Sequence, residues 1–194
     1  MEGKANGSQH FAWSTVFNSA NSGDSSLLDE ITTALGSTNW RGLSRSEWDY
    51  LLNTRTTVWH RYALIAGNGT NKTKQYLLMF PDDFKADDWK TETMGTQPSN
   101  FDNSTATIKT YTDAQFTAMQ NAGILILPAA GQCYDERFSY VGWTGYYWST
   151  TSKDSNYAYN LKFVDGTIST TDKGHKSSTY EYKALNSVRL VYPL

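Results

Sequence analysis

Hydrophobic positions along the chain change from helical spacing to strand-like alternation, and this change divides it into predicted elements. Apolar residues at helical spacing predict a short helix over residues 26–35 and a second helix over residues 45–53. The second follows an S-x-x-E capping box at Ser44, whose side chain is placed to accept from the first free amides. A further capping box at Thr112 begins a third helix, and Gly123 is the residue type that ends one.

Apolar runs that alternate or are continuous predict strands around these helices. The predicted strands are residues 58–66, 75–80, 124–128, 145–150, 157–164, 167–171 and 187–192. Asp165-Gly166 supplies the positive φ of a tight hairpin turn. Residues 82–110 are predicted to be mostly polar loop, and residues 172–186 a further loop. This order of helix, hairpin, helix and antiparallel sheet predicts a single α+β domain.

In the last third of the chain, predicted strands with regularly spaced apolar residues alternate with polar stretches of varied composition. Tyr159, Leu161 and Phe163 share one face of a predicted strand, whereas Asn160 and Lys162 share the other. Between such strands lie stretches of Asn, Asp, Ser, Thr, Lys and Tyr with almost no apolar character. Rigid strands that position chemically diverse loops are typical of a recognition domain.

Composition narrows the function classes. The chain has 194 residues, a net charge of -2 and a pI of about 5.9, which disfavours nucleic-acid binding through a basic surface. No apolar stretch approaches 18 residues, so no membrane insertion is expected. A single cysteine excludes an internal disulfide. The 13 Tyr and 7 Trp offer rigid, amphipathic contact area, which suits a binding surface or the bulk of a small core.

Candidate catalytic and metal-binding groups are sparse. The acidic pairs Asp82-Asp83, Asp87-Asp88 and Asp135-Glu136 are adjacent on predicted loops, whereas glycosidase carboxylates face each other across a substrate. Oxygen-rich loops suit calcium, but no EF-hand pattern is present. Cys133 has the character of an incidental buried thiol rather than a reactive one. We therefore predict no catalysis, no metal site and no cofactor.

The predicted binding face comes from residues 143–186. Its candidates are polar or aromatic positions that flank the predicted strands or lie on their solvent side, with the tyrosines as anchors and the lysines adding charge. They are Trp143, Lys153, Asp154, Asn156, Tyr157, Asn160, Lys162, Thr167, Ser169, Lys176, Ser178, Tyr180 and Tyr182. We expect them to converge on one exposed face of the sheet.

Five blocks of residues carry a family resemblance, and they span roughly residues 40–192. They are Trp40-Arg41-x-Leu43-x-x-x-Glu47-Trp48-x-Tyr50-Leu51, then the Leu125–Gly131 run, Gly145–Thr151, Ala158-Tyr159-x-Leu161-x-Phe163 and the closing Ser187–Val191. In this order they resemble bacterial C-type-lectin-like domains of the FISUMP kind, the major paralogous domain of Bacteroidetes surface proteins.

The resemblance implies a C-type-lectin-like fold in which two helices pack on a small antiparallel sheet and the terminal strands lie close together. Relatives of this kind serve as tip or surface adhesins, and some are variable proteins of diversity-generating retroelements. It therefore implies a domain over residues 39–194, preceded by an N-terminal segment 1–38. The expected location is extracellular, on a bacterial cell surface, a pilus tip or a phage virion. The N-terminus lacks the apolar centre of a signal peptide, so either none exists or the chain begins after it.

The chain departs from related groups in two respects. It lacks the E-P-N and W-N-D tripeptides of calcium-dependent animal lectins, and its one cysteine gives no second thiol for the oxygen chemistry of formylglycine-generating enzymes. The residues therefore favour a non-catalytic domain that binds a protein or cell-surface ligand through a variable face. The alternatives are a carbohydrate-binding module of fixed specificity and, third, an enzyme on the same fold.

Overall fold

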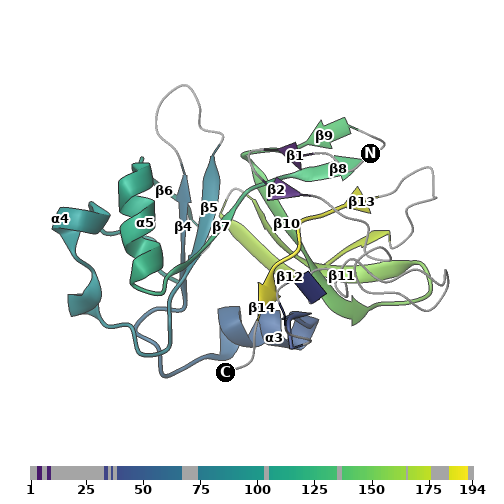
Figure 1. Cartoon of the computed structure of the whole chain (residues 1–194), viewed down its shortest axis with the longest axis horizontal. Helices are drawn as coiled ribbons and strands as arrows, with labels where there is room; N and C mark the ends of the chain where they lie inside the picture. The colour runs from purple at the N-terminus through teal and green to yellow at the C-terminus, as the bar shows by residue number, and fades with distance from the viewer. Residues whose placement is uncertain are drawn as a thin grey trace.

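The computed structural model describes residues 4–5, 8–9, 33–34, 36, 39–66, 74–102, 105–134, 137–164, 166–175 and 184–191. The fold is mixed α+β, as predicted, with strands predominating (Figure 1). A four-stranded sheet with helix α5 lies on one side of the molecule, and the strands from β8 to β13 lie on the other. Helix α3 lies at the base between these two parts.

Helices and short strands are interspersed up to β7. In order they are β1 (Lys4–Ala5), β2 (Ser8–Gln9), β3 (Arg41–Gly42), α3 (Arg45–Asp49), the π-helix η1 (Tyr50–Thr54), β4 (Tyr62–Ala66), β5 (Gln75–Met79), the 3-10 helix η2 (Ala86–Asp88), α4 (Thr91–Met94), β6 (Thr107–Ile108), α5 (Asp113–Asn121) and β7 (Leu125–Pro128).

The elements that follow β7 are strands. They are β8 (Gln132–Tyr134), β9 (Arg137–Ser139), β10 (Thr144–Ser152), β11 (Tyr157–Val164), β12 (Thr167–His175), β13 (Ala184–Leu185) and β14 (Leu190–Val191). The sheet orders are β6-β4-β5-β7, β10-β11-β12 and β13-β8-β9. β14 pairs antiparallel with β3, which brings the two ends of the predicted domain together.

Both capping boxes form as predicted. The Ser44 side chain accepts from the Glu47 amide at the start of α3, and Thr112 and Gln115 exchange the equivalent bonds at α5. The predicted 45–53 helix continues from α3 into η1. Gly123 has φ +84 immediately after α5, which a residue with a side chain rarely adopts. Local capping chemistry thus determines where these helices begin and where α5 ends.

Two hydrophobic cores lie on opposite faces of the four-stranded sheet. Leu64 and Leu77 point into the first core, which also holds Trp48, Leu161 and Phe163. The neighbours of Leu64 and Leu77 along β4 and β5 point to the other face and enter a second core, to which α5 also contributes. This core holds Ala63, Ile65, Leu78, Phe80, Phe84, Trp89, Met94, Tyr111, Met119 and Ile124. The first core therefore joins the two sheets, and the β10-β11-β12 sheet rests on it.

Several predicted boundaries are wrong. The 58–66 strand begins only at Tyr62, because the Asp102 carboxylate accepts from the amides of Arg61 and Tyr62 at 2.8 and 3.1 Å. The 82–110 stretch contains η2, α4 and β6, because Phe84, Trp89 and Met94 enter the second core. β12 runs on to His175, whereas in the described part of the strand predicted at 187–192 only Leu190–Val191 form a strand and Ser187 forms an isolated bridge. Of the predicted 26–35 helix, Thr33 and Ala34 are helical and the rest lies outside the described residues.

The start of α3 carries an acid-sensitive ion pair. Both Glu47 oxygens accept from Arg41, at 2.9 and 2.5 Å, and one also accepts from the Ser44 amide at 2.8 Å. The hydrogen bond from Arg41 lowers the pKa of Glu47 from 4.5 to about 2, with smaller contributions from Ser44 and the Arg41 charge. This stabilisation is complete above the unfolded pKa and is lost as the pH falls from about 4.5 through about 2.

We expect Glu47→Gln to lower the free energy of unfolding by about 1 kcal/mol at pH 7, after allowance for solvent screening of a partly exposed pair. The difference from wild type should shrink as the pH falls below about 4.5 and approach zero at pH 1, where Glu47 is protonated in both states. Urea unfolding of both proteins at the two pH values measures it. A difference that stays constant across this range would show that the carboxylate charge contributes nothing.

Candidate ligand-binding face

Strands β10, β11 and β12 form an antiparallel sheet with two unlike faces. Successive side chains of a strand alternate between faces, and directly opposed residues share one. Tyr147 pairs with Leu161, and both are buried in the first core, so this side is the inner face. Tyr146, Lys162 and Ser169 form a row on the other side, the outer face. The inner face anchors the sheet, and the outer face is directed away from the core.

The inner face is closely packed. Leu161 and Phe163 are fully buried, and the rings of Tyr147 and Phe163 stack at 6.3 Å. A Cβ at Gly145 would overlap the Phe163 ring, which explains the glycine within β10. Burial raises the pKa of Tyr147, whose hydroxyl donates to the Pro128 carbonyl at 2.8 Å. These contacts give the outer face a rigid support.

Residues 140–143, the aromatic turn, flank the outer face. Tyr140 is 57% exposed and Trp143 43%, although large aromatic side chains are usually more buried than this. Tyr140 has φ +62, and its carbonyl accepts from the amides of Trp143 and Thr144 at 2.9 and 3.0 Å. Gly142 accepts from the Gln75 amide at 2.8 Å and donates to the Ala129 carbonyl at 2.7 Å. Backbone bonds thus hold two exposed rings in place.

A pocket of about 580 Å³ opens between the aromatic turn and the outer face. It is lined by Tyr140, Trp143, Thr144, Tyr146, Lys162 and Val164. This volume lies within the usual range for small-ligand pockets. Its walls are largely aromatic, with one ammonium group and hydroxyl groups, so they can stack on a flat or ring-shaped group and hydrogen-bond to its edge.

Lys162 provides the positive charge of this pocket. Its Nζ lies 5.5 Å from the centroid of the Tyr146 ring and 3.7 Å from Oδ2 of Asp172. Burial raises the pKa of the Tyr146 phenol to about 12, and electrostatic interactions with Asp172 and Tyr140 add to the rise. Tyr146 is therefore protonated at neutral pH. The pocket thus presents a cation beside a neutral phenol, and the Asp172 carboxylate lies next to the cation.

The structure brings part of the predicted face together. Trp143 and Lys162 line the pocket, Ser169 lies directly opposite Lys162, and Thr167 lies opposite Val164. Lys176, Ser178, Tyr180 and Tyr182 lie outside the described residues.

Four predicted residues lie elsewhere, at the hairpin end, residues 152–157. Tyr157 has the same parity along β11 as Leu161 and Phe163, so it belongs to the side of the inner face. Both Lys153 and Lys173 lie over its ring, with Nζ 5.9 and 5.2 Å from the centroid. The convergence of all candidates on one face is therefore wrong, because a strand places odd and even positions on opposite sides.

Asp154 and Asn156 form the turn of this hairpin. The Asp154 carboxylate accepts from the amides of Asn156 and Tyr157, each at 2.8 Å. The hydrogen bond from the Asn156 amide makes the largest contribution to lowering the pKa of Asp154. The hydrogen bond from the Tyr157 amide and the charges of Lys153 and Lys173 add to this effect. Asp154 thus has a local structural role in the turn.

A second prediction, that Asn160 is exposed on the binding face, is wrong. Asn160 has the parity of the outer face, but the residue is only 2% exposed. It lies opposite Trp148 and Asp172. The segment beside β10 covers this part of the sheet, because Ser187 pairs with Tyr147 and Val188 packs against Trp148. The exposed outer face therefore begins at Lys162. Tyr159, predicted as core, is half-buried, with the Arg45 guanidinium 4.7 Å from its ring centroid.

Sequence reasoning missed Tyr140, Tyr146 and Asp172. The parity of Tyr146, opposite to that of Tyr147, would have placed it on the outer face. Tyr140 precedes Val141-Gly142, a position typical of a turn, but nothing local shows that its ring reaches the sheet. The pairing of Asp172 with Lys162 depends on a β-bulge, which places Thr170 and Thr171 opposite Leu161.

Other candidate chemistry in the described ranges is dispersed. Among the described residues, no three His, Cys, Asp or Glu side chains form a group suited to a metal ion. Asp82 pairs with Arg55 at 2.8 Å, Asp88 accepts from the Lys85 amide, and Cys133 is buried. No helix in the part of the chain that is described is long and apolar enough to cross a membrane.

Comparison with known proteins identifies one family. A family model described as "Domain of unknown function (DUF8237)" matches residues 93–191, just over half of the chain. The matched segment contains α5 and the whole β10-β11-β12 sheet. The chain belongs to this family. No curated protein and no solved structure matches the chain.

Proposed function

We propose that this chain is a non-catalytic recognition domain that binds its ligand through the outer face and the aromatic turn. The observation that carries the proposal is the pocket of about 580 Å³, where exposed Trp143 and Tyr140 lie beside Lys162 on a well-packed sheet. Exposed aromatic rings held by a rigid scaffold provide contact area at a small cost in conformational entropy. Such residues commonly act as anchors of a binding interface.

Three structural features support a C-type-lectin-like fold for the domain. The strands near its ends pair, β3 with β14. Helix α3 packs into the first core and helix α5 into the second, each against antiparallel strands, and a separate antiparallel sheet bears the candidate face. With the five sequence blocks, this arrangement favours an adhesin-like role on a bacterial cell surface, a pilus tip or a phage virion.

A carbohydrate ligand is the second candidate. Trp143 and Tyr140 are exposed rings that can stack on sugar faces, and Lys162, Asp172 and Ser169 provide polar partners for hydroxyl groups. Binding of the labelled chain to bacterial cells distinguishes the two ligand classes. Proteinase K treatment of the cells removes a protein ligand, whereas periodate oxidation removes a glycan.

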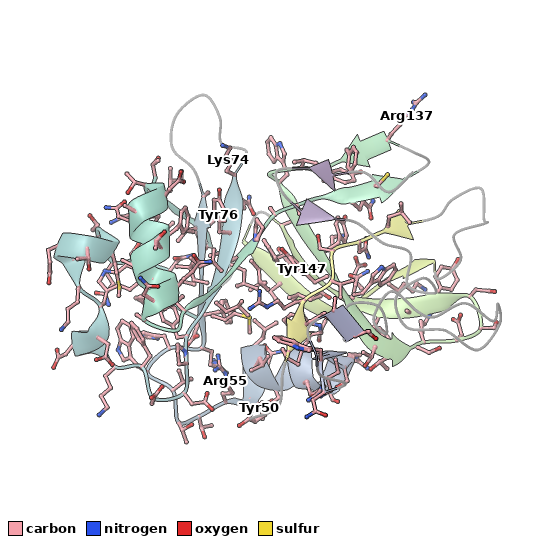
Figure 2. All side chains as sticks on the ribbon, viewed as in Figure 1. Tyr50, Arg55, Lys74, Tyr76, Arg137 and Tyr147 are labelled. Carbon is pink, nitrogen blue, oxygen red and sulfur yellow. The ribbon has the colours of Figure 1, made fainter. Side chains whose placement is uncertain are left out.

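Trp143→Ala is expected to reduce cell binding at least tenfold, because central aromatic anchors typically contribute about 2 kcal/mol or more. The melting temperature should change by less than about 2 °C, since the ring is already exposed. Flow cytometry measures binding, with Tyr50→Ala as the matched control. Tyr50 is 50% exposed on η1 at the base of the molecule (Figure 2), and it does not line the pocket. Equal binding by wild type and Trp143→Ala would exclude the pocket as the site.

We also propose that the face is diversified by a retroelement. A near-copy of the codons for residues 143–191, beside a reverse-transcriptase gene and differing mainly at adenines, is the expected observation. Differences that reach Lys162 and Ser169 but spare Leu161 would match the division into outer and inner faces. A copy whose differences fall on buried positions would contradict it, and the lack of a copy would leave a face of fixed specificity.

A further inference from the structure

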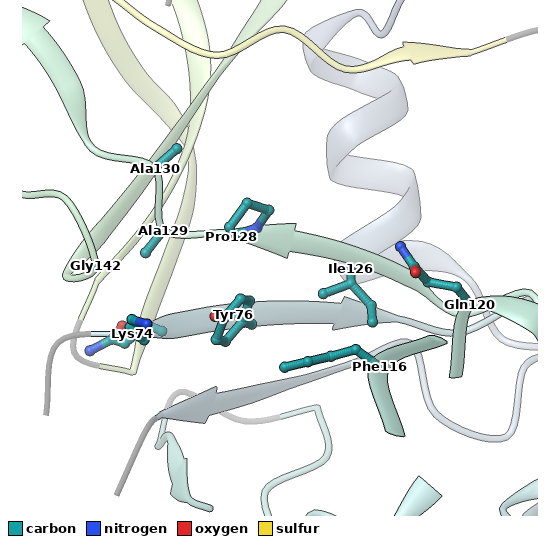
Figure 3. Close-up of a pocket in the computed structure, with 10 residues that line it drawn as sticks. Lys74, Tyr76, Phe116, Gln120, Ile126, Pro128, Ala129, Ala130 and Gly142 are labelled. Carbon is teal, nitrogen blue, oxygen red and sulfur yellow. The ribbon is translucent and has the colours of Figure 1, made fainter. Parts of the chain in front are cut away.

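A second pocket lies between β5, β7 and α5, and Gly142 of the aromatic turn forms part of its lining (Figure 3). Its volume is about 350 Å³, at the small end of the range for ligand pockets. It is lined by Lys74, Gln75, Tyr76, Phe116, Gln120, Ile126, Pro128, Ala129, Ala130 and Gly142. It shares no lining residue with the pocket of the outer face.

The walls of this pocket are apolar and suited to a ring. Tyr76 and Phe116 lie with their ring centroids 4.8 Å apart, inclined at 46°. Ile126 and Pro128 come from the neighbouring strand β7, where Pro128 pairs with Tyr76. A flat, apolar group placed against these side chains would gain contact with both rings.

The floor of the pocket is formed by hydrogen-bonded backbone. The Gln75 amide donates to Gly142, and the Ala129 amide donates to the Gln75 carbonyl, each at 2.8 Å. Because strand pairing and the aromatic turn hold these groups, the pocket exists before any ligand arrives. Preformed sites lose less conformational entropy on binding.

Polar groups lie at both ends of the apolar walls. Figure 3 shows Lys74 at one end and Gln120 at the other, with Tyr76 between them. Within the described ranges, the side chains of Lys74 and Gln120 have no hydrogen bond or ion pair with another residue. Burial raises the pKa of the Tyr76 phenol, and the charge of Asp113 adds to the rise, so this hydroxyl remains a donor at neutral pH.

We propose that this pocket binds a small aromatic carboxylate. The ring would lie against the Tyr76 and Phe116 rings and the neighbouring side chains of Ile126 and Pro128. The carboxylate would accept from the Lys74 ammonium and the Tyr76 hydroxyl, and Gln120 would contact a polar substituent at the far end. An ammonium beside a phenol donor complements a carboxylate better than a neutral group.

The test is a titration of the ¹⁵N-labelled chain with benzoate and with indole-3-acetate, followed by amide chemical shifts. We expect saturable shifts of the Tyr76, Gln120 and Ile126 amides, with a Kd on the order of 1 mM for benzoate, as ligand efficiency predicts for nine heavy atoms. Lys74→Met should weaken benzoate binding at least about tenfold. Lys90→Met, which changes another exposed lysine, is the matched control and should bind as wild type does.

Two neutral probes separate the alternatives. Benzamide should bind at least about tenfold more weakly than benzoate, because it lacks the charge that Lys74 pairs with. If N-acetylphenylalaninamide binds instead, with no effect of Lys74→Met, the pocket receives an aromatic side chain of a partner protein, and the proposal is wrong. The absence of saturable shifts up to 10 mM benzoate, about ten times the expected Kd, would also overturn it.

This inference and the proposed function fail independently. Lys74→Met should leave cell binding unchanged, and Trp143→Ala should leave the benzoate titration unchanged. A chain that binds benzoate but no cells would retain the second pocket and lose the recognition role. The reverse result would retain the outer face and lose the second pocket.

Discussion

Replacing Arg55 with alanine is expected to lower the free energy of unfolding by about 3 kcal/mol, because several charge-assisted hydrogen bonds are lost together. The side chain is 4% exposed and donates to the carbonyls of Leu51, Phe80 and Arg61 at 2.8–2.9 Å. It also bonds Asp82 at 2.8 Å. Figure 2 places Arg55 close to the base of the molecule, where η1 approaches the four-stranded sheet.

Replacing Arg55 should lower the free energy of unfolding more than replacing its ion-pair partner Asp82. Asp82 is 57% exposed, so Asp82→Asn is expected to cost only about 1 kcal/mol. Arg137→Ala, which changes an exposed arginine on β9, is the matched control and should remain within about 0.5 kcal/mol of wild type. Urea unfolding at pH 7 measures all three variants. An Arg55→Ala variant as stable as Arg137→Ala would show that the buried guanidinium contributes no net stability.

Leu161→Ala is expected to cost about 3 kcal/mol, within the range measured for leucine-to-alanine changes in buried cores. Leu161 is fully buried on the inner face against Trp48, Tyr147 and Phe163. The neighbouring Lys162→Ala should cost less than about 1 kcal/mol, because the ion pair with Asp172 is partly exposed. Adjacent residues of one strand should therefore differ severalfold in their effect on stability.

Thermal and urea unfolding of these two variants measure this difference. A Lys162→Ala variant as unstable as Leu161→Ala would mean that the outer face is part of the folded core. Equal and small effects of both would mean that the inner face does not anchor the sheet.

Elements governed by local chemistry were predictable from the sequence. Both capping boxes, the glycine after α5 and the hairpin that joins β11 to β12 depend on residues close together in the chain. Alternation also assigned Leu161 and Lys162 to opposite faces correctly. Neighbouring residues are sufficient for these predictions because each rests on a backbone hydrogen bond or a strand period.

Features that depend on distant residues were not predictable. Strand β4 begins at Tyr62 and not at residue 58, because Asp102 accepts from the amides of Arg61 and Tyr62. Asp102 lies about 40 residues further along the chain. Asn160 has the parity of an exposed position, but the segment containing Ser187 and Val188 covers that part of the sheet. The outer-face pocket could not be predicted because one of its walls is Tyr140. The position of Tyr140 depends on the backbone hydrogen bonds of Gly142 to β5 and to Ala129.

The central claim is that the β10-β11-β12 sheet has a structural inner face and an outer face that is free to change. Saturation mutagenesis of these strands, with protease resistance of the displayed chain as readout, tests it most directly. We expect most substitutions at Lys162, Thr167 and Ser169 to change the free energy of unfolding by less than about 1 kcal/mol. Most substitutions at Leu161 and Phe163 should abolish resistance. Equal tolerance on the two faces would contradict the claim.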